Sequence, residues 1–167
     1  MNSIEQAVEG RLTHLDGSGQ AHMVGISHKA PTYRQATASA QVIMSPQTLA
    51  AIMSATSAKG DVLSVARIAG ITAVKRTSDL IPLAHPLAIE ACSVEFDTAG
   101  PTCLIVKATV AVTGKTGVEM EVLAAVSIAA LTVYDMCKSA DVGMKITEIQ
   151  LDEKSGGKSG HYRRPGA

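Results

Sequence analysis

The chain has 167 residues, 46% of them hydrophobic, and its fifteen basic and fifteen acidic side chains balance to a formal charge of zero. This length is enough for one domain with a sizeable core, and the charge balance argues against a surface built to bind polyanions or membranes. One Phe, three Tyr and no Trp argue against nucleic-acid binding by base stacking on aromatic side chains.

The cysteines and the amino-terminal residues indicate a cytoplasmic protein. Cys92, Cys103 and Cys137 form no CxxC pair, which is typical of thiols in a reducing compartment. The first twenty residues contain no apolar run like that of a signal peptide. No stretch reaches the ~20 apolar residues that a membrane span needs. We therefore expect neither a membrane nor a nucleic acid among the partners.

The first part of the chain is predicted to consist of a flexible segment followed by extended strands. Residues 1–20 are polar and are expected to form a flexible segment. A short strand is expected over 23–27, and Pro31 then favours a loop or an edge strand. Residues 37–44 alternate between small apolar and polar side chains, so they predict a longer strand.

Two helices are predicted next. Ser45 and Pro46 form a typical helix start, with Ser45 as the N-cap and Pro46 in the first helical position, and Gly60 marks the end. Asp61 is placed to cap a second helix over residues 62–78.

The remaining elements complete a recognisable order. Strands are predicted over 88–96 and 103–112, a long helix within 114–138, and a last strand over 144–152. From residue 37 onward the order is β-α-α-β-β-α-β, which becomes βαββαβ if the two successive helices are counted as one crossover. This predicts an α+β, ferredoxin-like fold, with helices packed on one face of an antiparallel sheet.

A single folded domain is therefore expected over residues 21–154. It would be followed by a flexible tail rich in Gly and Lys over residues 155–167. No internal repeat and no linker to a second domain is present in the sequence.

The long helix has an apolar middle and charged ends. The charges must either reach water or line a pocket. Glu121 and Asp135 are fourteen positions apart, or ~21 Å along a continuous helix. They cannot both touch one small reacting centre within a single subunit. They either serve opposite ends of a long substrate or belong to sites that a neighbouring chain completes.

Asp135 and Lys138 share a helix face because they are three positions apart. An ordinary surface ion pair, worth under ~1 kcal/mol, would explain them. The alternative is a proton-transfer pair with shifted pKa values at the margin of a dry core.

The segment KRTSDLIPLAHPL also allows two interpretations. On pattern alone, Lys75 and Arg76 are solvated cations at a helix end and His85 is a histidine held in a turn. In the functional alternative, Pro82 and Pro86 stiffen the turn and so aim His85 at a ligand. The GKT and GKS triplets lack the first glycine of a P-loop, and the five histidines lack zinc-ligand spacing.

Three long motifs carry a family resemblance. GDVLSVARIAGITAVKRTSDLIPLAHPL (60–87), GKTGVEMEVLAAVSIAALTVYDMCK (114–138) and EKSGGKSG (153–160) resemble the cyclic pyranopterin monophosphate synthase family, molybdenum-cofactor biosynthesis protein C. The resemblance runs from about Leu12 to Tyr162.

The resemblance implies a lyase that acts in molybdenum cofactor biosynthesis. Its substrate would be 3′,8-cyclo-7,8-dihydroguanosine 5′-triphosphate, supplied by an upstream radical enzyme, and its products cyclic pyranopterin monophosphate and pyrophosphate. No metal or organic cofactor is implied. The implied assembly is a homohexamer, a trimer of dimers with the pocket at a dimer interface, and residues 21–154 would be its catalytic domain.

The resemblance also assigns residues, motif by motif. Residues matching the catalytic group are Asp135, Lys138, Lys59 and Lys154. Residues matching the substrate-contacting group are Leu83, Ala84, His85, Met120, Glu121, Glu119 beside them, Lys75, Lys29 and Arg34. On this basis, Lys138 oriented by Asp135 would move protons through a depressed lysine pKa, and Lys59 and Lys154 would assist at the ring. His85 and Glu121 would hold the purine-derived part of the substrate, and Lys29 and Arg34 would lie near the triphosphate.

Two positions depart from the family pattern. Ala84 stands where the family usually has Cys, and Gly25 stands where it usually has Asp. The alternative function is therefore a family member that binds the nucleotide without converting it.

Overall fold

The computed structural model describes residues 14, 15, 17–54 and 60–166. In chain order its elements are β1 (Thr32–Ile43), α1 (Pro46–Met53), α2 (Val62–Lys75), α3 (Thr77–Leu80), β2 (Ala91–Thr98), β3 (Cys103–Gly114), α4 (Glu119–Cys137), β4 (Lys145–Ser155) and β5 (Tyr162–Arg163).

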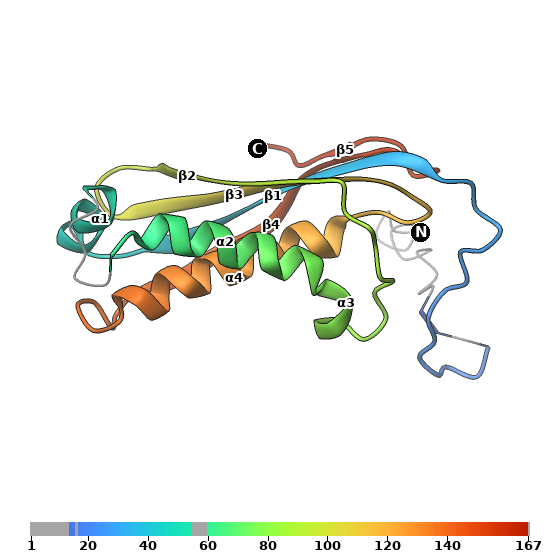
Figure 1. Ribbon diagram of the computed structural model, residues 1–167, viewed down its shortest axis with the longest axis horizontal. Helices are drawn as coiled ribbons and strands as arrows, with labels where there is room; N and C mark the ends of the chain where they lie inside the picture. Colours follow the sequence, from blue (N-terminus) through green and yellow to red (C-terminus); the bar gives the residue numbers. More distant parts are fainter. Residues whose placement is uncertain (1–13, 16, 55–59, 167) are drawn as a thin grey trace, which may run out of the picture.

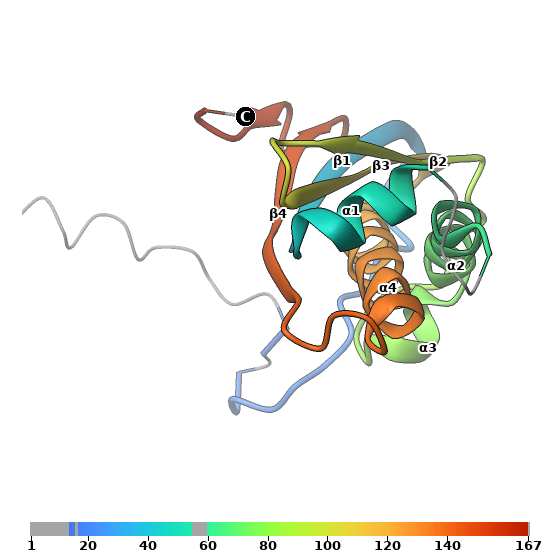
Figure 2. The ribbon, with the colours of Figure 1, turned by 90° about the vertical axis from the view of Figure 1, so that its left-hand side faces the viewer.

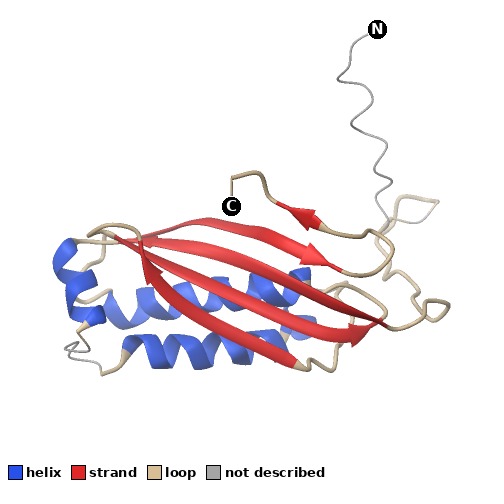
Figure 3. Cartoon of the chain, turned by 90° about the horizontal axis from the view of Figure 1, so that it is seen from above, coloured by secondary structure: helices blue, strands red, loops and turns tan. Residues whose placement is uncertain are grey.

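The described strands form one antiparallel sheet in the order β2-β3-β1-β4-β5. The four long strands, read as β4-β1-β3-β2, have the strand order of a ferredoxin-like fold. Helices α2 and α4 lie side by side on one face of the sheet, and α1 lies near one end (Figure 1, Figure 2). Figure 3 shows the strands running along the length of the domain, with the helices on the face beneath. The predicted fold is confirmed.

Strand β1 is central in the sheet, between β3 and β4, and its residues alternate between the two faces. Ala38, Ala40 and Val42 are fully buried on the helix side. Thr37 and Ser39 lie on the other face, where Ser39 Oγ donates to Asp152 Oδ1 of β4 at 3.0 Å. Small side chains on the inner face allow the helix layer to approach the sheet closely.

Both predicted helix starts are confirmed. Ser45 Oγ accepts a hydrogen bond from Thr48 N at 3.2 Å, and Asp61 Oδ1 accepts one from Ser64 N at 2.9 Å. The predicted helix over 62–78 is broken, because α2 ends at Lys75 and the short α3 begins at Thr77. Helix α1 ends at Met53, before the residues 55–59 that lie outside the described part.

Helices α2 and α4 pack with their backbones close together. The Cβ of an alanine at Gly70 would lie 3.0 Å from Ala125 O and 3.3 Å from Ala129 Cβ. Ala125, Val126 and Ala129 are fully buried. The two helices run antiparallel, so the start of α2 lies near the end of α4 (Figure 1).

Helix α4 is long and apolar enough, by length and composition, to cross a membrane. Its buried side chains instead pack onto the sheet and α2 within this chain. Core helices of soluble proteins meet the same length and composition test, and α4 is such a helix.

The strand predicted over 23–27 is wrong. These residues run as irregular chain, and Met23 and Gly25 are exposed. A strand needs a neighbour for its backbone hydrogen bonds, and this segment has no ladder partner in the described part of the chain. The pairing of β1 with β3 begins only at Thr32.

The last strand lies within the segment predicted to be a flexible tail. Tyr162 and Arg163 pair with Lys154 and Glu153 of β4. Arg164 Nε also donates to Leu151 O at 2.9 Å. These contacts add a short fifth strand at the sheet edge, while the flexibility of residues 155–167 stays a prediction.

Candidate active site

Helix α4 separates the predicted site residues into two groups. Glu119, Met120 and Glu121 form its first turn, whereas Asp135 lies sixteen positions further along. The helix is continuous, so the two ends are ~24 Å apart at 1.5 Å per residue. The structure therefore supports the spacing argument that one small site within one chain cannot contain both groups.

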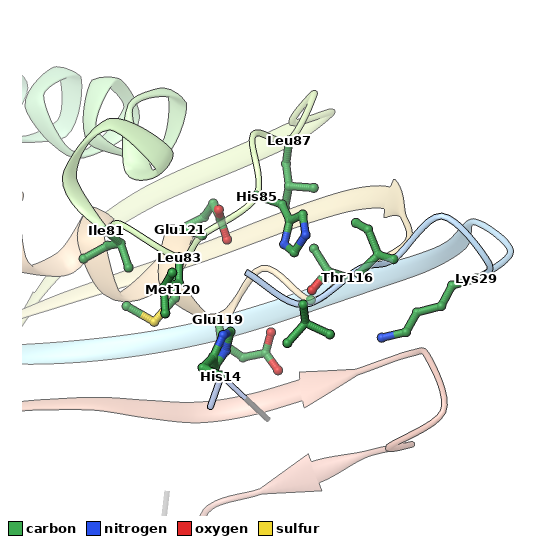
Figure 4. Close-up of a pocket in the computed structure, with 14 residues that line it drawn as sticks. His14, Lys29, Ile81, Leu83, His85, Leu87, Thr116, Glu119, Met120 and Glu121 are labelled. Carbon is green, nitrogen blue, oxygen red and sulfur yellow. The ribbon is translucent and has the colours of Figure 1, made fainter. Parts of the chain in front are cut away.

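A pocket of about 510 Å³ lies at the amino-terminal end of α4 (Figure 4). Ligand sites in proteins typically enclose ~300–1,000 Å³, with mostly apolar walls and few polar groups. The residues that line it come from the amino-terminal segment, the turn before β2 and the start of α4: His14, Val24, Ile26, Lys29, Ile81, Leu83, Ala84, His85, Leu87, Thr116, Gly117, Glu119, Met120 and Glu121.

Seven of the predicted substrate-contacting residues meet in this pocket. They are Leu83, Ala84, His85, Met120, Glu121, Glu119 and Lys29. The turn that carries His85 follows α3, where Ala84 N donates to Ile81 O at 3.0 Å. His85 is half-buried and faces the pocket beside the carboxyl-bearing start of α4 (Figure 4).

Glu121 is the buried acid of the pocket. Its residue is only 4% exposed, and burial raises the pKa of its carboxyl, with a smaller contribution from the charge of Glu119. A carboxylate in such surroundings gains more from hydrogen-bond donors than it would in water. Glu121 is thus suited to bind N–H groups of a ligand that enters the pocket.

A second, smaller cavity adjoins the first on the β4 side. Its lining comes from β1, β4 and the loops next to them: Arg34, Gln35, Gly117, Val118, Glu119, Lys154, Ser155, Gly156 and Ser159. Glu119 lines both cavities, and its Oε1 lies 2.7 Å from Lys154 Nζ. Arg34 Nε donates to Gly114 O at 2.9 Å. The structure thus brings Arg34 and Lys154 to the edge of the pocket.

The predicted catalytic pair lies at the other end of α4. Lys138 Nζ is 2.6 Å from Asp135 Oδ1, and the two side chains are 53% and 66% exposed. The hydrogen bond and charge of Asp135 raise the pKa of Lys138. In the isolated chain the shift is opposite to the depressed lysine pKa that the sequence analysis proposed, because the nearest charge is an anion.

The remaining predicted residues are placed apart from both groups or lie outside the described part. Lys75 is exposed in the last turn of α2 and does not line the pocket. Lys59 belongs to the residues 55–59 that are not described. Gly25 is exposed, and a Cβ at that position would have nothing within 4 Å.

Several lining residues were missed by the sequence reasoning. Thr116 and Gly117 belong to the GKTG turn, which was dismissed only because it is not a P-loop. His14 comes from the segment predicted to be loose, and its O accepts a hydrogen bond from His22 N at 2.9 Å. The GKTG motif lies just before Glu119 and Glu121 at the start of α4. It was the one sequence signal for the part of the pocket formed by Thr116 and Gly117.

Metal binding finds no support in the described ranges. No three His, Cys, Asp or Glu side chains there come together in a group that could hold a metal ion.

Comparisons with known proteins identify the family of the chain. A family model described as the MoaC family matches residues 23–157. The chain is 59% identical over 156 residues to "Cyclic pyranopterin monophosphate synthase 3" of Mycobacterium tuberculosis, covering 93% of this chain and 88% of that protein. The protein of the same name in Mycobacterium bovis has the same identity and coverage.

A second, differently numbered relative gives the same result. "Cyclic pyranopterin monophosphate synthase 1" of Mycobacterium bovis is 56% identical over 153 residues, covering 92% of this chain and 90% of that protein. The matched region includes both ends of α4, the turn before β2 and strand β4. The chain therefore belongs to the MoaC family.

Proposed function

We propose that the protein is a cyclic pyranopterin monophosphate synthase, a lyase of molybdenum cofactor biosynthesis. It converts 3′,8-cyclo-7,8-dihydroguanosine 5′-triphosphate to cyclic pyranopterin monophosphate and pyrophosphate. The observation that carries the proposal is the meeting of seven predicted substrate-contacting residues in one nucleotide-sized pocket. The names of relatives that are 56–59% identical to the chain support the same activity.

The two adjoining cavities suggest how the substrate lies. The purine-derived ring occupies the larger pocket, where Glu121 accepts hydrogen bonds from ring N–H groups and His85 contacts the ring edge. The triphosphate extends toward Lys29, Arg34 and Lys154, whose charges offset its own.

The chemistry requires proton transfers and one phosphoryl displacement. Ring opening and pterin closure need a positioned acid and base, for which we assign Lys138 with Asp135 as its orienting partner. Lys59 assists at the ring, Lys154 stabilises the charge of the leaving pyrophosphate, and Lys75 contributes further positive charge. In the displacement, a substrate hydroxyl gives its proton to the base and its oxygen bonds to the α-phosphorus, while the bond between the α-phosphorus and the oxygen that bridges to the β-phosphate breaks. Pyrophosphate leaves with the electron pair of that bond.

A neighbouring subunit is needed to complete the site. Asp135 and Lys138 lie ~24 Å from the pocket residues of their own chain, too far to act on one ring. Exposed apolar side chains on the helix layer, Ile68 at 66% and Leu131 at 53%, provide a surface for a second copy. We assign the protein to a homohexamer, a trimer of dimers, in which one subunit brings its catalytic pair to the pocket of another.

The cellular setting follows from the same function. The protein works in the cytoplasm, without a cofactor, nucleic acid or membrane, downstream of the radical enzyme that makes its substrate. We assign residues 21–154 as its catalytic domain.

The second candidate function is nucleotide binding without conversion. Ala84 lines the pocket with a methyl group where the family usually has a thiol. Gly25 is exposed near the pocket-lining residues Val24 and Ile26, and it supplies no carboxylate. These two positions are the observations that favour a sensor.

A turnover assay separates the two functions. The purified protein is incubated with the cyclised GTP derivative, and pyrophosphate and pterin product are measured. Lys138→Ala is expected to abolish turnover while the circular dichroism spectrum stays that of the folded protein. Near-normal product formation by that variant would refute the catalytic assignment. Tight substrate binding by the unmodified protein without release of pyrophosphate would establish the sensor.

A further inference from the structure

The smaller cavity has the composition of an anion site. Arg34 and Lys154 supply positive charge, and Ser155 and Ser159 supply hydroxyl groups. Gly156, which also lines the cavity, and the neighbouring Gly157 have φ values of +94° and +71°, which only glycine adopts readily, so the loop turns tightly here. The one carboxylate among the residues that line this cavity is that of Glu119.

This cavity is filled by the protein itself. Its free volume is about 10 Å³, and a single water molecule already needs ~10–15 Å³. Glu119 Oε1 is held 2.7 Å from Lys154 Nζ, with the two side chains 31% and 28% exposed. A phosphate group can therefore reach Lys154 in this cavity only after the Glu119 carboxylate has left.

The position of that carboxylate depends on Gly117. A Cβ built on Gly117 would collide with Glu119 Oε2, so Glu119 can fold back to Lys154 only because residue 117 has no side chain. Gly117 is not in the left-handed region of φ, so its backbone would accept alanine. Glycine is therefore needed at position 117 because it has no Cβ, and not because of its backbone conformation.

We propose that Glu119 is an internal counter-ion that occupies the anion subsite of the resting protein and is displaced by a phosphate of the ligand. The proposal rests on the proposed function, since it assumes a phosphate-bearing substrate and a pyrophosphate product. Lys154 stays paired and oriented when the site is empty. Return of Glu119 to Lys154 competes with pyrophosphate and so promotes its release.

The test is isothermal titration of inorganic pyrophosphate, without divalent metal, into the full-length protein and two variants. Glu119→Gln removes the competing charge. Gly117→Ala keeps the charge but expels the carboxylate from the cavity. Both are expected to bind pyrophosphate about tenfold more tightly, the effect of giving up one partly buried ion pair.

Matched controls account for charge and for the added methyl group. Glu95→Gln removes an exposed carboxylate on β2, and Gly143→Ala adds a Cβ whose nearest neighbour is 3.6 Å away. Both are expected to bind pyrophosphate like the unmodified protein. Melting curves of all variants establish that they are folded, and a loss of structure cannot mimic tighter binding.

The outcomes distinguish this inference from the proposed function. Unchanged or weaker pyrophosphate binding by folded Glu119→Gln overturns the counter-ion, even if the unmodified protein turns over its substrate. Absence of pyrophosphate binding and of turnover in every form overturns both proposals. Tighter binding by only one of the two variants also overturns the inference, because each is designed to free the same subsite.

Discussion

Lys138 Nζ lies 2.6 Å from Asp135 Oδ1 at the exposed end of α4, far from the pocket at the other end of the same helix. The aspartate fixes the ammonium group and favours its protonated form, which raises the pKa of Lys138. The pair is therefore arranged to act first as a proton donor. Its distance from the pocket means that its target belongs to another subunit.

Asp135→Asn is expected to lower the pKa of Lys138 toward its ordinary value of 10.5. A raised folded pKa means that the pair stabilises the protein below 10.5 and that this contribution is lost as pH rises through the folded value. The pair is exposed, so little change in stability at neutral pH is expected. An NMR titration of labelled lysine measures the pKa. An unchanged Lys138 pKa would contradict the coupling.

The same variant should lose activity without losing its fold. Loss of the orienting carboxylate is expected to reduce turnover by about 10²-fold or more, the usual scale of general acid–base catalysis. Steady-state pyrophosphate release at saturating substrate checks this. Asp97→Asn, an exposed change at the end of β2, serves as the control that should remain active.

Glu121→Gln is expected to weaken substrate binding by about 10- to 100-fold, the range for losing hydrogen bonds to a charged group. It keeps the shape of the side chain and most of the pocket. Titration of the substrate into the protein under conditions without turnover gives the affinity. Binding equal to that of the unmodified protein would remove Glu121 from the substrate site.

Glu121 also predicts a pH effect on stability. Its carboxyl pKa is raised by burial from an ordinary 4.5, so the folded protein holds that proton more tightly than the unfolded chain does. This contribution is complete below pH 4.5 and is lost as pH rises through the higher folded value. Between pH 4 and pH 8, the free energy of unfolding measured with denaturant should therefore decline less for Glu121→Gln than for the unmodified protein. An identical decline in both proteins would show that the carboxyl does not titrate as proposed.

Mixed assemblies provide a direct test of the shared site. Lys138→Ala damages one end of α4 and Glu121→Gln damages the other. At a substrate concentration well below the Kd of Glu121→Gln, each variant alone is expected to have little activity. If each site combines the two ends from different subunits, random pairing gives half mixed dimers with one intact site each. About a quarter of the unmodified activity should return after the two variants are dissociated and reassembled together.

The control for this experiment is a mixture of the variants that has not been dissociated. Recovery only after reassembly supports a site completed by a neighbour. No recovery in assemblies shown by mass spectrometry to be mixed would place both ends of α4 at one site within a chain, against the distance along the helix.

Gly70→Ala tests the contact that sets the helix layer. The added Cβ would lie 3.0 Å from Ala125 O and 3.1 Å from Val94 Cγ2. Overpacking of this kind costs ~1–3 kcal/mol, partly offset by the ~1 kcal/mol by which alanine favours a helix over glycine. A lowered urea midpoint with an unchanged slope is expected. A midpoint at or above that of the unmodified protein would show that the helices separate easily.

Local patterns allowed much of the fold to be predicted. Alternation over 37–44 placed Ala38 and Val42 on the buried face, and Ser45 and Asp61 marked the helix starts. These features depend on neighbours within a few residues, where backbone sterics and capping act. The strand predicted over 23–27 failed for the complementary reason, because a strand also needs a distant partner.

The sequence by itself determined the order of the main strands and helices from residue 37 onward, the family, and the fact that Glu121 and Asp135 lie far apart on one continuous helix. Only the tertiary structure decided which distant residues meet. Sheet register and helix packing bring the turn with His85 to the start of α4, and they bring Lys154 within 2.7 Å of Glu119, thirty-five positions away in the chain. Long-range packing, which no local spacing encodes, also buried Glu121. The raised pKa of Lys138, in contrast, comes from Asp135, which lies only three positions away on the same helix.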